Sequence, residues 1–438
     1  MSGMRETSPS RFGDRNVRQA NLRRLAFEWR RIRRMSLATF VWKLVLKLLG
    51  LALGLLLLPV AALLHLAGYR HVRIFTDRIG HLALEPDCLL KEQALGLAPH
   101  KKWIMLAPPG RVSNEHLLAY WQPHFLVVRN GWACFLVTSL SRWGLMRHDM
   151  TPYILAVGRA QAAYRIHREW GTRPPLLALT REDVEWGREM LARMGIPDEA
   201  WFACVHAREA GFSPIDEELQ QHRNSSIEYV IPAMQEIVRR GGRVIRIGDP
   251  TMQPLSPLPG VIDYAHSPYK SARMDVVLCA RARFILGNTS GIGLVGTVFG
   301  VPCAAANLIP LSTLWFGERD ISIPKLFWSR ELGRYLRIDE VLDSSAANFH
   351  YAALYEEAKI DPVENSAQDI LMLTIEMLDR LDGRYLPADD EAEIAERVRR
   401  LFTPRHIAYG SAAAMAASFL RRHPELLPPR DQGAGARS

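Results

Sequence analysis

The sequence has few of the residues that build disulfide frameworks and metal centres. Its 438 residues include only five cysteines, an odd number, with no Cys-x-x-Cys pair. This pattern argues against a disulfide framework and against a zinc site. There is also no Asp-x-Asp motif, so we expect no bound metal. The cysteines lie mostly in apolar runs and are predicted to be buried thiols in a reducing compartment.

Two common catalytic motifs are missing as well. The chain contains neither a Gly-x-x-x-x-Gly-Lys-Ser/Thr loop nor a Gly-x-Ser-x-Gly elbow, which argues against P-loop and α/β-hydrolase enzymes. Gly291-x-Gly293-x-x-Gly296 does match a dinucleotide-binding pattern. However, a four-residue loop precedes it, and no convincing acidic residue ends the next strand. We therefore expect these glycines to allow close packing of a helix on a sheet rather than NAD binding.

Positive charge is abundant and is concentrated at the N-terminus. The chain has 55 Lys and Arg against 46 Asp and Glu, a formal net charge of +9, which suits an anionic partner. Residues 1–20 look disordered, and residues 21–35 have apolar positions on one helical face among many arginines. Such a basic amphipathic helix favours binding to an anionic membrane surface. An RNA-binding arm is the alternative, but we expect no nucleic acid partner.

One apolar run is long enough to cross a membrane. Leu48–Gly68 has no charged residue, and only His65 in it is strongly polar. Pro59 should kink or break a helix there. Because both flanks are basic, the positive-inside rule does not set the orientation. We prefer a re-entrant or in-plane segment, with a spanning helix as the alternative.

The rest of the chain alternates strand and helix patterns, which predicts an α/β protein with largely parallel sheets. A chain of this length favours two domains, here two Rossmann-like domains facing across a cleft. The predicted strands are 72–75, 103–107 and 125–128, then 201–205, 243–247, 261–265, 284–287 and 303–307. The predicted divisions are an arm (1–35), a membrane-associated helical segment (36–69), two Rossmann-like domains (70–198 and 199–345), C-terminal helices (346–427) and a disordered tail (428–438).

Candidate site residues follow the strands of the second Rossmann-like domain. The stretch Trp201–Phe212 contains a buried strand that stops at His206-Ala207-Arg208-Glu209, near the turn at Gly211. In open α/β sheets, ligands bind at the carboxyl ends of the strands. Arginine suits such a site because its planar fork holds phosphate oxygens bidentately. Later strands end in Gly248-Asp249, His266-Ser267 and Asn288-Thr289-Ser290-Gly291.

The last of these loops predicts an anion site. Backbone amides at Ser290–Ile292 should open a helix N-terminus, and the hydroxyls of Thr289 and Ser290 add hydrogen bonds. With Arg208 and Lys270 they would form a cradle for a diphosphate. Ordinary helix capping by Thr289 and Ser290 is the alternative interpretation.

These spaced motifs resemble a family of bacterial glycosyltransferases of surface-polysaccharide synthesis. The resemblance runs from about Val72 to Glu340. A more distant similarity links the chain to protein O-fucosyltransferases, which have a GT-B fold, a His-x-Arg element and a later Gly-x-x-Ser-Ser loop. The motifs that carry the resemblance are Arg78-Ile79-Gly80-His81-Leu82, His206-Ala207-Arg208-Glu209, Arg223-Asn224, Arg246-Ile247-Gly248-Asp249-Pro250, Val261–Ser267, Lys270-Ser271, Met274-Asp275 and Phe284–Gly291.

The resemblance implies a metal-independent, inverting transferase without a tightly bound cofactor. Its co-substrate would be a nucleotide-sugar, with a GDP-linked sugar as one candidate. Arg208 and Thr289-Ser290 match the positions that hold the donor diphosphate. By the same analogy His81 faces the donor across the cleft as the acceptor base, with Glu85 as its rival. Asp249 and His266 would touch the base or ribose.

The implied acceptor is a glycolipid or polysaccharide, and the implied location is the cytosolic side of the inner membrane. A nucleotide-sugar epimerase is the alternative enzyme. A membrane-tethered scaffold with a non-catalytic nucleotide site is the alternative outside catalysis.

Overall fold

The computed structural model describes residues 36–155, 160–211 and 219–428. The expected basic arm, Phe212 and all but the first residue of the expected tail lie outside these ranges. Internal contacts divide the chain into two compact units, residues 1–159 and 160–438. The sequence predicted the division between residues 198 and 199. In the structure the segment 160–198 belongs to the second unit instead of the first.

The first unit contains a three-stranded parallel sheet in the order β1-β2-β3. We expected the first strand at Val72–Phe75, but pairing with the next strand begins earlier, at Tyr69 opposite Lys102, and ends at Val72 opposite Met105. The strands are β1 (Tyr69–Val72), β2 (Lys102–Leu106) and β3 (Phe125–Val128), and the helices are α2 (Leu37–Leu56), α3 (Leu58–Leu66), α4 (Ile79–Ala94), α5 (Glu115–Trp121) and α6 (Gly131–Leu140).

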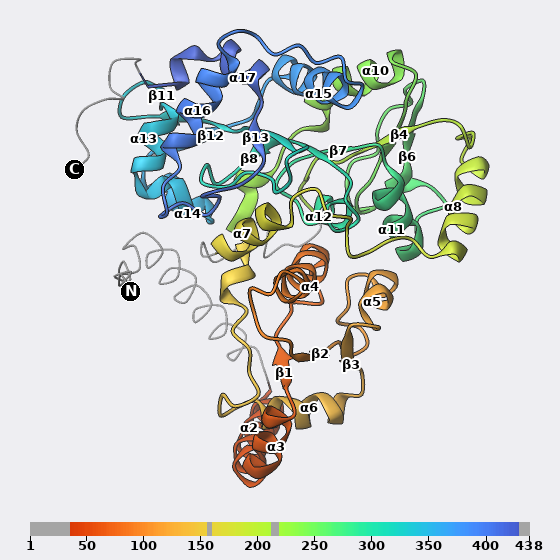
Figure 1. The fold of residues 1–438 in the computed structure, drawn as a ribbon, viewed down its shortest axis with the longest axis vertical. Helices are drawn as coiled ribbons and strands as arrows, with labels where there is room; N and C mark the ends of the chain where they lie inside the picture. The colour runs from red at the N-terminus through yellow and green to blue at the C-terminus, as the bar shows by residue number, and fades with distance from the viewer. Residues whose placement is uncertain (1–35, 156–159, 212–218, 429–438) are drawn as a thin grey trace. The chain divides into compact units, whose positions relative to one another are not determined.

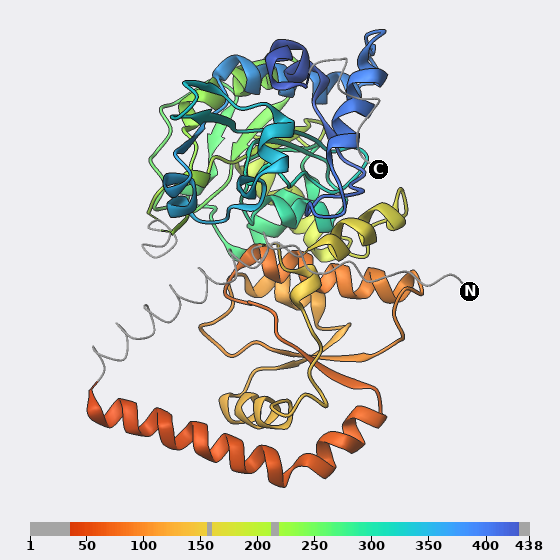
Figure 2. The same cartoon turned by 90° about the vertical axis from the view of Figure 1, so that its left-hand side faces the viewer.

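The apolar segment forms two helices rather than one. Figure 2 shows α2 and α3, in red, meeting at a bend. The break is at Leu57, and Pro59 occupies the first turn of α3, where its missing N–H is not needed. Among the described residues, α2 alone is long and apolar enough to cross a membrane by length and composition. The predicted break is therefore confirmed, and α2 begins at Leu37, near the start of the expected segment 36–69 and ahead of the apolar run from Leu48.

Helix α2 packs closely on α6 through two glycines one turn apart (Figure 1). A Cβ at Gly54 would come within 2.7 Å of the Ser139 carbonyl oxygen, and a Cβ at Gly50 within 3.4 Å of the Phe135 ring. Small residues four apart let helix backbones approach in this way. The remaining α2 side chains are largely exposed and apolar, with Leu37 78% and Leu56 75% exposed.

The second unit is organised around a seven-stranded parallel sheet in the order β13-β9-β8-β7-β4-β5-β6. Its strands are apolar and mostly buried, as expected when helices cover both faces. The expected second Rossmann-like unit is therefore present in this sheet. The strands are β4 (Phe202–Val205), β5 (Arg243–Arg246), β6 (Val261–Asp263), β7 (Ile285–Gly287), β8 (Cys303–Leu308), β9 (Ile321–Pro324) and β13 (Ala414–Met415).

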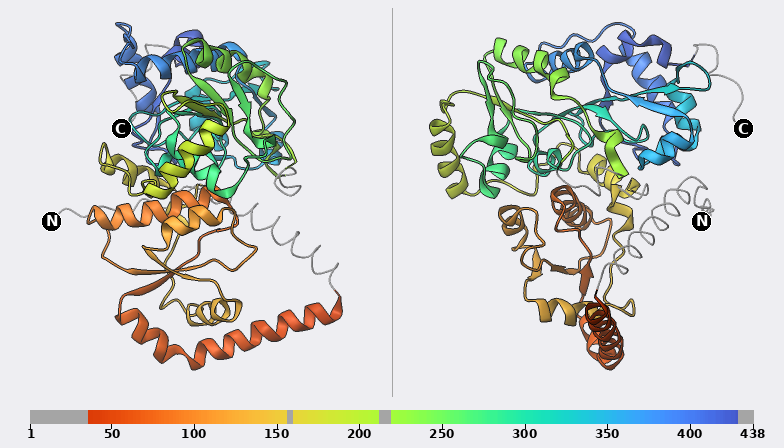
Figure 3. Two further views of the ribbon diagram at one scale, coloured as in Figure 1. Left: turned by 90° about the vertical axis from the view of Figure 1, so that its right-hand side faces the viewer. Right: turned by 180° about the vertical axis from the view of Figure 1, so that it is seen from behind.

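Helices cover both faces of this sheet (Figures 1 and 3). One layer contains α10 and α15, which pack on each other, and the other contains α8, α11 and α12. Helix α8 has a side-chain cap, because the Thr180 hydroxyl accepts from the Asp183 N–H at 3.1 Å. The bounds are α7 (Gln161–Trp170), α8 (Arg181–Arg193), α10 (Ile231–Arg239), α11 (Ala272–Arg281), α12 (Gly293–Val298) and α15 (Ala367–Leu381).

The C-terminal part from residue 346 to 402 is mainly helical, as the sequence predicted. A small antiparallel sheet in the order β11-β10-β12 interrupts it. Its strands and the remaining helices are β10 (Leu326–Ser329), β11 (Arg334–Tyr335), β12 (Ile360–Val363), α13 (Ile338–Asp343), α14 (Ala352–Glu357), α16 (Glu391–Leu401) and α17 (Ala417–Arg422).

The glycine pattern around α12 serves packing, as expected. A Cβ on Gly296 would lie 2.2 Å from the Ile285 side chain on β7, and one on Gly293 would lie 3.1 Å from the Trp315 ring. Both glycines therefore bring α12 against its neighbours.

Candidate functional site

The sheet of the second unit has a topological switch point between β4 and β7. From β4 the chain runs outward to β5 and β6, then returns to β7 on the other side of β4. Connections on the two sides of such a point leave in opposite directions, and ligands bind in the crevice outside the carboxyl ends. Here those ends lead into His206-Ala207-Arg208 and Asn288-Thr289.

Asn288 ties the loops at the switch point together. Its side chain is 3% exposed, and its Oδ1 accepts from the Arg208 backbone N–H at 3.2 Å. Its Nδ2 donates to the Arg223 carbonyl at 3.1 Å and to the Ser225 hydroxyl at 2.9 Å. These contacts give Asn288 a positioning role: it fixes the backbone of the segments that carry the two arginines.

Two guanidinium groups lie at the switch point. Arg208 donates from Nη1 to the Asn224 side-chain oxygen and, at 3.4 Å, to the Gln220 carbonyl. Arg223 donates from Nε to the Thr289 carbonyl at 3.1 Å. The sequence motifs contained Arg223 but assigned it no role.

A buried lysine adds a third positive group. Lys325 is 3% exposed, and its Nζ donates to the Asn224 carbonyl at 2.7 Å. Burial lowers the pKa of this amine to about 8, while Glu364 acts in the opposite direction. Sequence reasoning missed Lys325, although a lysine inside an apolar strand-forming run was a usable signal.

The imidazoles near these cations are held neutral. Burial lowers the pKa of His206 to about 4, and its Nδ1–H donates to the Ile247 carbonyl at 3.0 Å, joining the ends of β4 and β5. Burial and the Arg223 charge lower the pKa of His222 to about 3. His206 therefore supports the loop, and the positive charges at the switch point are those of Arg208, Arg223 and Lys325.

The Thr289-Ser290 loop differs from the prediction. Helix α12 begins only at Gly293 and has six residues, and its N-cap Ile292 makes no side-chain cap bond. The Thr289 hydroxyl instead accepts from the Ile309 N–H at 3.1 Å. The capping alternative is therefore wrong. The expected helix is present and begins directly after Ser290–Ile292, and the anion site at its start stays a prediction. Within the described residues, the Ser290 hydroxyl makes no hydrogen bond.

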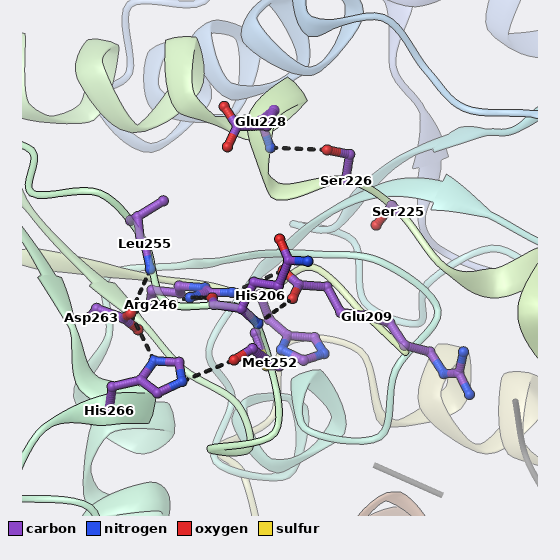
Figure 4. A network of polar contacts seen from close by, with 12 residues as sticks. His206, Glu209, Ser225, Ser226, Glu228, Arg246, Met252, Leu255, Asp263 and His266 are labelled. Atoms are coloured by element: carbon purple, nitrogen blue, oxygen red, sulfur yellow. Dashed lines mark hydrogen bonds and ion pairs between the residues drawn. The ribbon is translucent and has the colours of Figure 1, made fainter. Parts of the chain in front are cut away.

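A charged network lies beneath the loop that follows β5 (Figure 4). The fully buried Arg246 donates to Glu209 at 2.8 Å and to Asp263 at 3.2 Å. The Asp263 carboxylate also faces His266 Nδ1 at 2.8 Å, and His266 Nε2 faces the Met252 carbonyl at 2.9 Å. The two ring nitrogens of His266 are thus used to hold the loop.

The other predicted donor-site residues lie around this loop. Gly248 has a φ of 154°, and a Cβ there would meet the Met252 sulfur at 2.2 Å. Asp249 accepts from the Thr251 N–H at 2.9 Å and so shapes a turn. Lys270 forms an ion pair with Asp275. Their proposed contacts with a donor remain predictions, as do those of His266 and Gly291.

We predict that Glu209→Gln lowers the free energy of unfolding. The change removes a charge-assisted partner of the fully buried Arg246, which should cost about 1.5–3 kcal/mol. Urea unfolding of the full chain in mild detergent, followed by tryptophan fluorescence, measures the loss. Glu228→Gln on the exposed surface of the same unit is the control and should change stability by less than about 0.5 kcal/mol. Equal midpoints for both variants would contradict the prediction.

In the first unit, His81 and Glu85 form a pair. They lie one helical turn apart at the start of α4, with Glu85 Oε1 hydrogen-bonded to His81 Nδ1. Glu85 is 1% exposed, and burial raises the pKa of its carboxyl against the opposing effect of His81. The His81 side chain is 26% exposed. The sequence treated the two as rivals, but the geometry makes Glu85 the group that orients the imidazole.

The described residues contain no group of three or more His, Cys, Asp or Glu side chains arranged to hold a metal ion. All five cysteines are buried and free, as the sequence predicted. The candidate site is therefore composed of cationic and hydrogen-bonding groups.

No protein-family model and no curated protein matches the sequence. Among solved structures, the chain is similar to a glycosyl transferase family 9 protein from Veillonella parvula (12% identity, 54% of this chain and 80% of that chain, TM-score 0.35). It is also similar to the ADP-heptose LPS heptosyltransferase II of E. coli (15% identity, 54% and 84%, TM-score 0.33). A third is TibC, an iron-containing dodecameric glycosyltransferase of enterotoxigenic E. coli (12% identity, 72% and 76%, TM-score 0.38). Each of these proteins is a glycosyltransferase, the class that the sequence motifs resemble.

Proposed function

We propose that the chain is a glycosyltransferase that moves a sugar from a nucleotide-sugar donor to a glycolipid or polysaccharide acceptor at a membrane. The observation that carries this proposal is the pair of arginines, Arg208 and Arg223, at the switch point of a Rossmann-like sheet, with the buried Lys325 behind them. This is where such sheets bind ligands, and the three cations suit a diphosphate.

The chemistry required of this site is stabilisation of a leaving nucleoside diphosphate. Negative charge grows on the diphosphate as the glycosidic bond to the donor breaks, and fixed donors aimed at that charge lower the barrier. Arg208 would hold the phosphate oxygens bidentately, and the Ser290 hydroxyl and the Gly291 amide would add hydrogen bonds. Gly248, Asp249 and His266 would lie beside the base or ribose. We propose that transfer is metal-independent and inverting.

The first unit would supply the acceptor base. Glu85 accepts the Nδ1–H of His81, which leaves Nε2 as the nitrogen able to take a proton from the acceptor hydroxyl. The His81 side chain is partly exposed, so an acceptor hydroxyl would have access to it. We therefore propose His81 as the catalytic base and Glu85 as its positioning residue.

We further propose a location at the cytosolic face of the inner membrane. Nucleotide-sugars are cytosolic, and the exposed apolar surface of α2 and α3 suits a bilayer. The break at Leu57 favours an in-plane arrangement of these helices.

The proposal is tested with a panel of nucleotide-sugars in thermal-shift measurements on the full chain. The panel includes GDP-fucose, because of the sequence resemblance, and ADP-heptose, the ligand in the heptosyltransferase names. A true donor should raise the melting temperature in proportion to its occupancy, because a ligand at 100 times its Kd stabilises the folded state by about 2.7 kcal/mol. If no nucleotide-sugar produces a shift, the proposal fails.

Measurements of donor turnover then distinguish a glycosyltransferase from an epimerase and from a scaffold. A glycosyltransferase consumes the bound donor only when membrane extract supplies an acceptor. Conversion of the sugar without any acceptor would identify an epimerase. Donor binding without consumption, even with membrane extract present, would identify a scaffold.

A further inference from the structure

The first unit carries an apolar groove that is formed in part by the exposed helix α2. It lies between α2 and α6, has a volume of about 480 Å³ and is largely open to its surroundings. Its lining is entirely apolar and consists of Leu49, Leu53, Trp132, Ala133, Phe135 and Leu136. Ligand pockets in proteins commonly have volumes of 300–1,000 Å³.

The exposed surface around the groove continues its apolar character. Leu49 on α2 is 49% exposed, Trp132 on α6 is 69% exposed, and Leu63 on α3 is 66% exposed. Contiguous exposed apolar surface on this scale marks a protein or membrane interaction site. Because α2 is long and apolar enough for a bilayer, hydrocarbon is the environment that these side chains fit.

The segments that form and flank the groove carry charge of one sign only. Residues 36–73 and 131–148, which contain the three helices, include no Asp or Glu but several Lys and Arg. Arg142 lies beside the groove-lining Phe135: its guanidinium and the Phe135 ring both lie within 3.4 Å of the position of a Gly50 Cβ. In the part of the chain that the structure describes, no carboxylate pairs with Arg142, which suits a negatively charged headgroup.

We propose that this groove binds one hydrocarbon chain of an anionic membrane lipid, with Arg142 contacting the lipid phosphate. The apolar lining favours the hydrocarbon chain of the lipid, and the positive charge beside it favours an anionic headgroup over a zwitterionic one. Helix α6 thereby becomes part of the membrane-binding surface. The inference does not depend on the proposed enzymatic function.

The test uses the full chain in phosphatidylcholine vesicles that contain a lipid with a photoactivatable group on its acyl chain. The probe is either phosphatidylglycerol, which is anionic, or phosphatidylcholine. Labelled peptides are identified by mass spectrometry. We expect the phosphatidylglycerol probe to label residues 49–53 and 132–136 at least fivefold more than the phosphatidylcholine probe. Leu63 and Leu66 on α3 report general bilayer contact and should be labelled equally by both probes.

Two variants with matched controls make the test specific. Ala133→Trp fills the groove and should reduce labelling of residues 132–136 at least fivefold, whereas Leu97→Trp, elsewhere in the same unit, should not. Arg142→Gln should abolish the preference for phosphatidylglycerol, whereas Arg111→Gln should keep it. Labelling of α3 should be the same in all four chains.

Two outcomes would overturn the inference. Equal labelling of the groove by both probes, unchanged by Ala133→Trp, would mean that the surface makes only general contact with the bilayer. Disulfide-linked dimers of a Leu136→Cys chain in the same vesicles would mean that a second copy of the protein covers the groove. The natural cysteines are buried, so the introduced thiol would be the reactive one among the described residues.

Discussion

Replacing Arg208 with alanine should raise the Kd for the donor nucleotide-sugar by about a hundredfold or more. Arg208 follows β4 directly at the switch point, and Asn288 fixes its backbone N–H. A hydrogen bond to a charged group contributes about 1.5–3 kcal/mol, and a bidentate pair makes two. A hundredfold change corresponds to about 2.8 kcal/mol, at 1.4 kcal/mol for each factor of ten. Isothermal titration with the donor found in the thermal-shift panel measures the change.

The control for this variant is Arg243→Ala. Arg243 has the same charge and is the first residue of β5, so it lies at the opposite, amino edge of the same sheet and is exposed. The Arg243→Ala chain should bind the donor as tightly as the unmodified chain does. Arg208→Lys keeps the charge but loses the planar fork, so its affinity should fall between the two. Unchanged affinity in a folded Arg208→Ala chain would remove the arginine from the donor site.

The position of this site could be predicted because the strands of the second unit are short apolar runs that stop at polar residues. Trp201–Val205 was predicted as a strand, and the structure has it at Phe202–Val205, followed by Arg208 as expected. The strand order, which creates the switch point, depends on pairing between strands that are far apart in the sequence. No local pattern shows that β7 lies beside β4 rather than beside β6.

The same reason explains the residues that sequence reasoning missed. Lys325 contacts Asn224 across 101 positions of sequence, so neither residue alone indicates the contact. The Thr289 hydroxyl seemed suited to a helix cap, but the N–H of Ile309 binds it instead. The pairing of His81 with Glu85 was easier to predict, because residues four apart on a helix lie on one face. From the sequence, His81 and Glu85 were instead interpreted as alternative catalytic bases.

Replacing His81 with alanine should lower kcat by about 10²- to 10⁴-fold, the usual contribution of general acid–base catalysis. The donor Kd should not change, because His81 belongs to the first unit and the proposed donor groups belong to the second. Measuring kcat with saturating donor and membrane extract, and donor binding separately, distinguishes this loss from misfolding. His124→Ala, an exposed histidine of the same unit, should retain full activity.

The pH profile tests the role of Glu85. Burial raises the pKa of the Glu85 carboxyl, so the rate of the unmodified chain should fall at acid pH as this carboxylate takes up a proton and stops accepting the Nδ1–H of His81. As a carboxylate, Glu85 fixes the Nδ1–H of His81 and leaves Nε2 as the nitrogen that takes the proton. Glu85→Gln removes the charge but keeps an acceptor, so the acid limb should move to lower pH while the donor Kd stays constant. Glu85→Leu removes both and should lose more activity than Glu85→Gln. An acid limb that is unchanged in both variants would make Glu85 a purely structural residue and leave His81 to act alone.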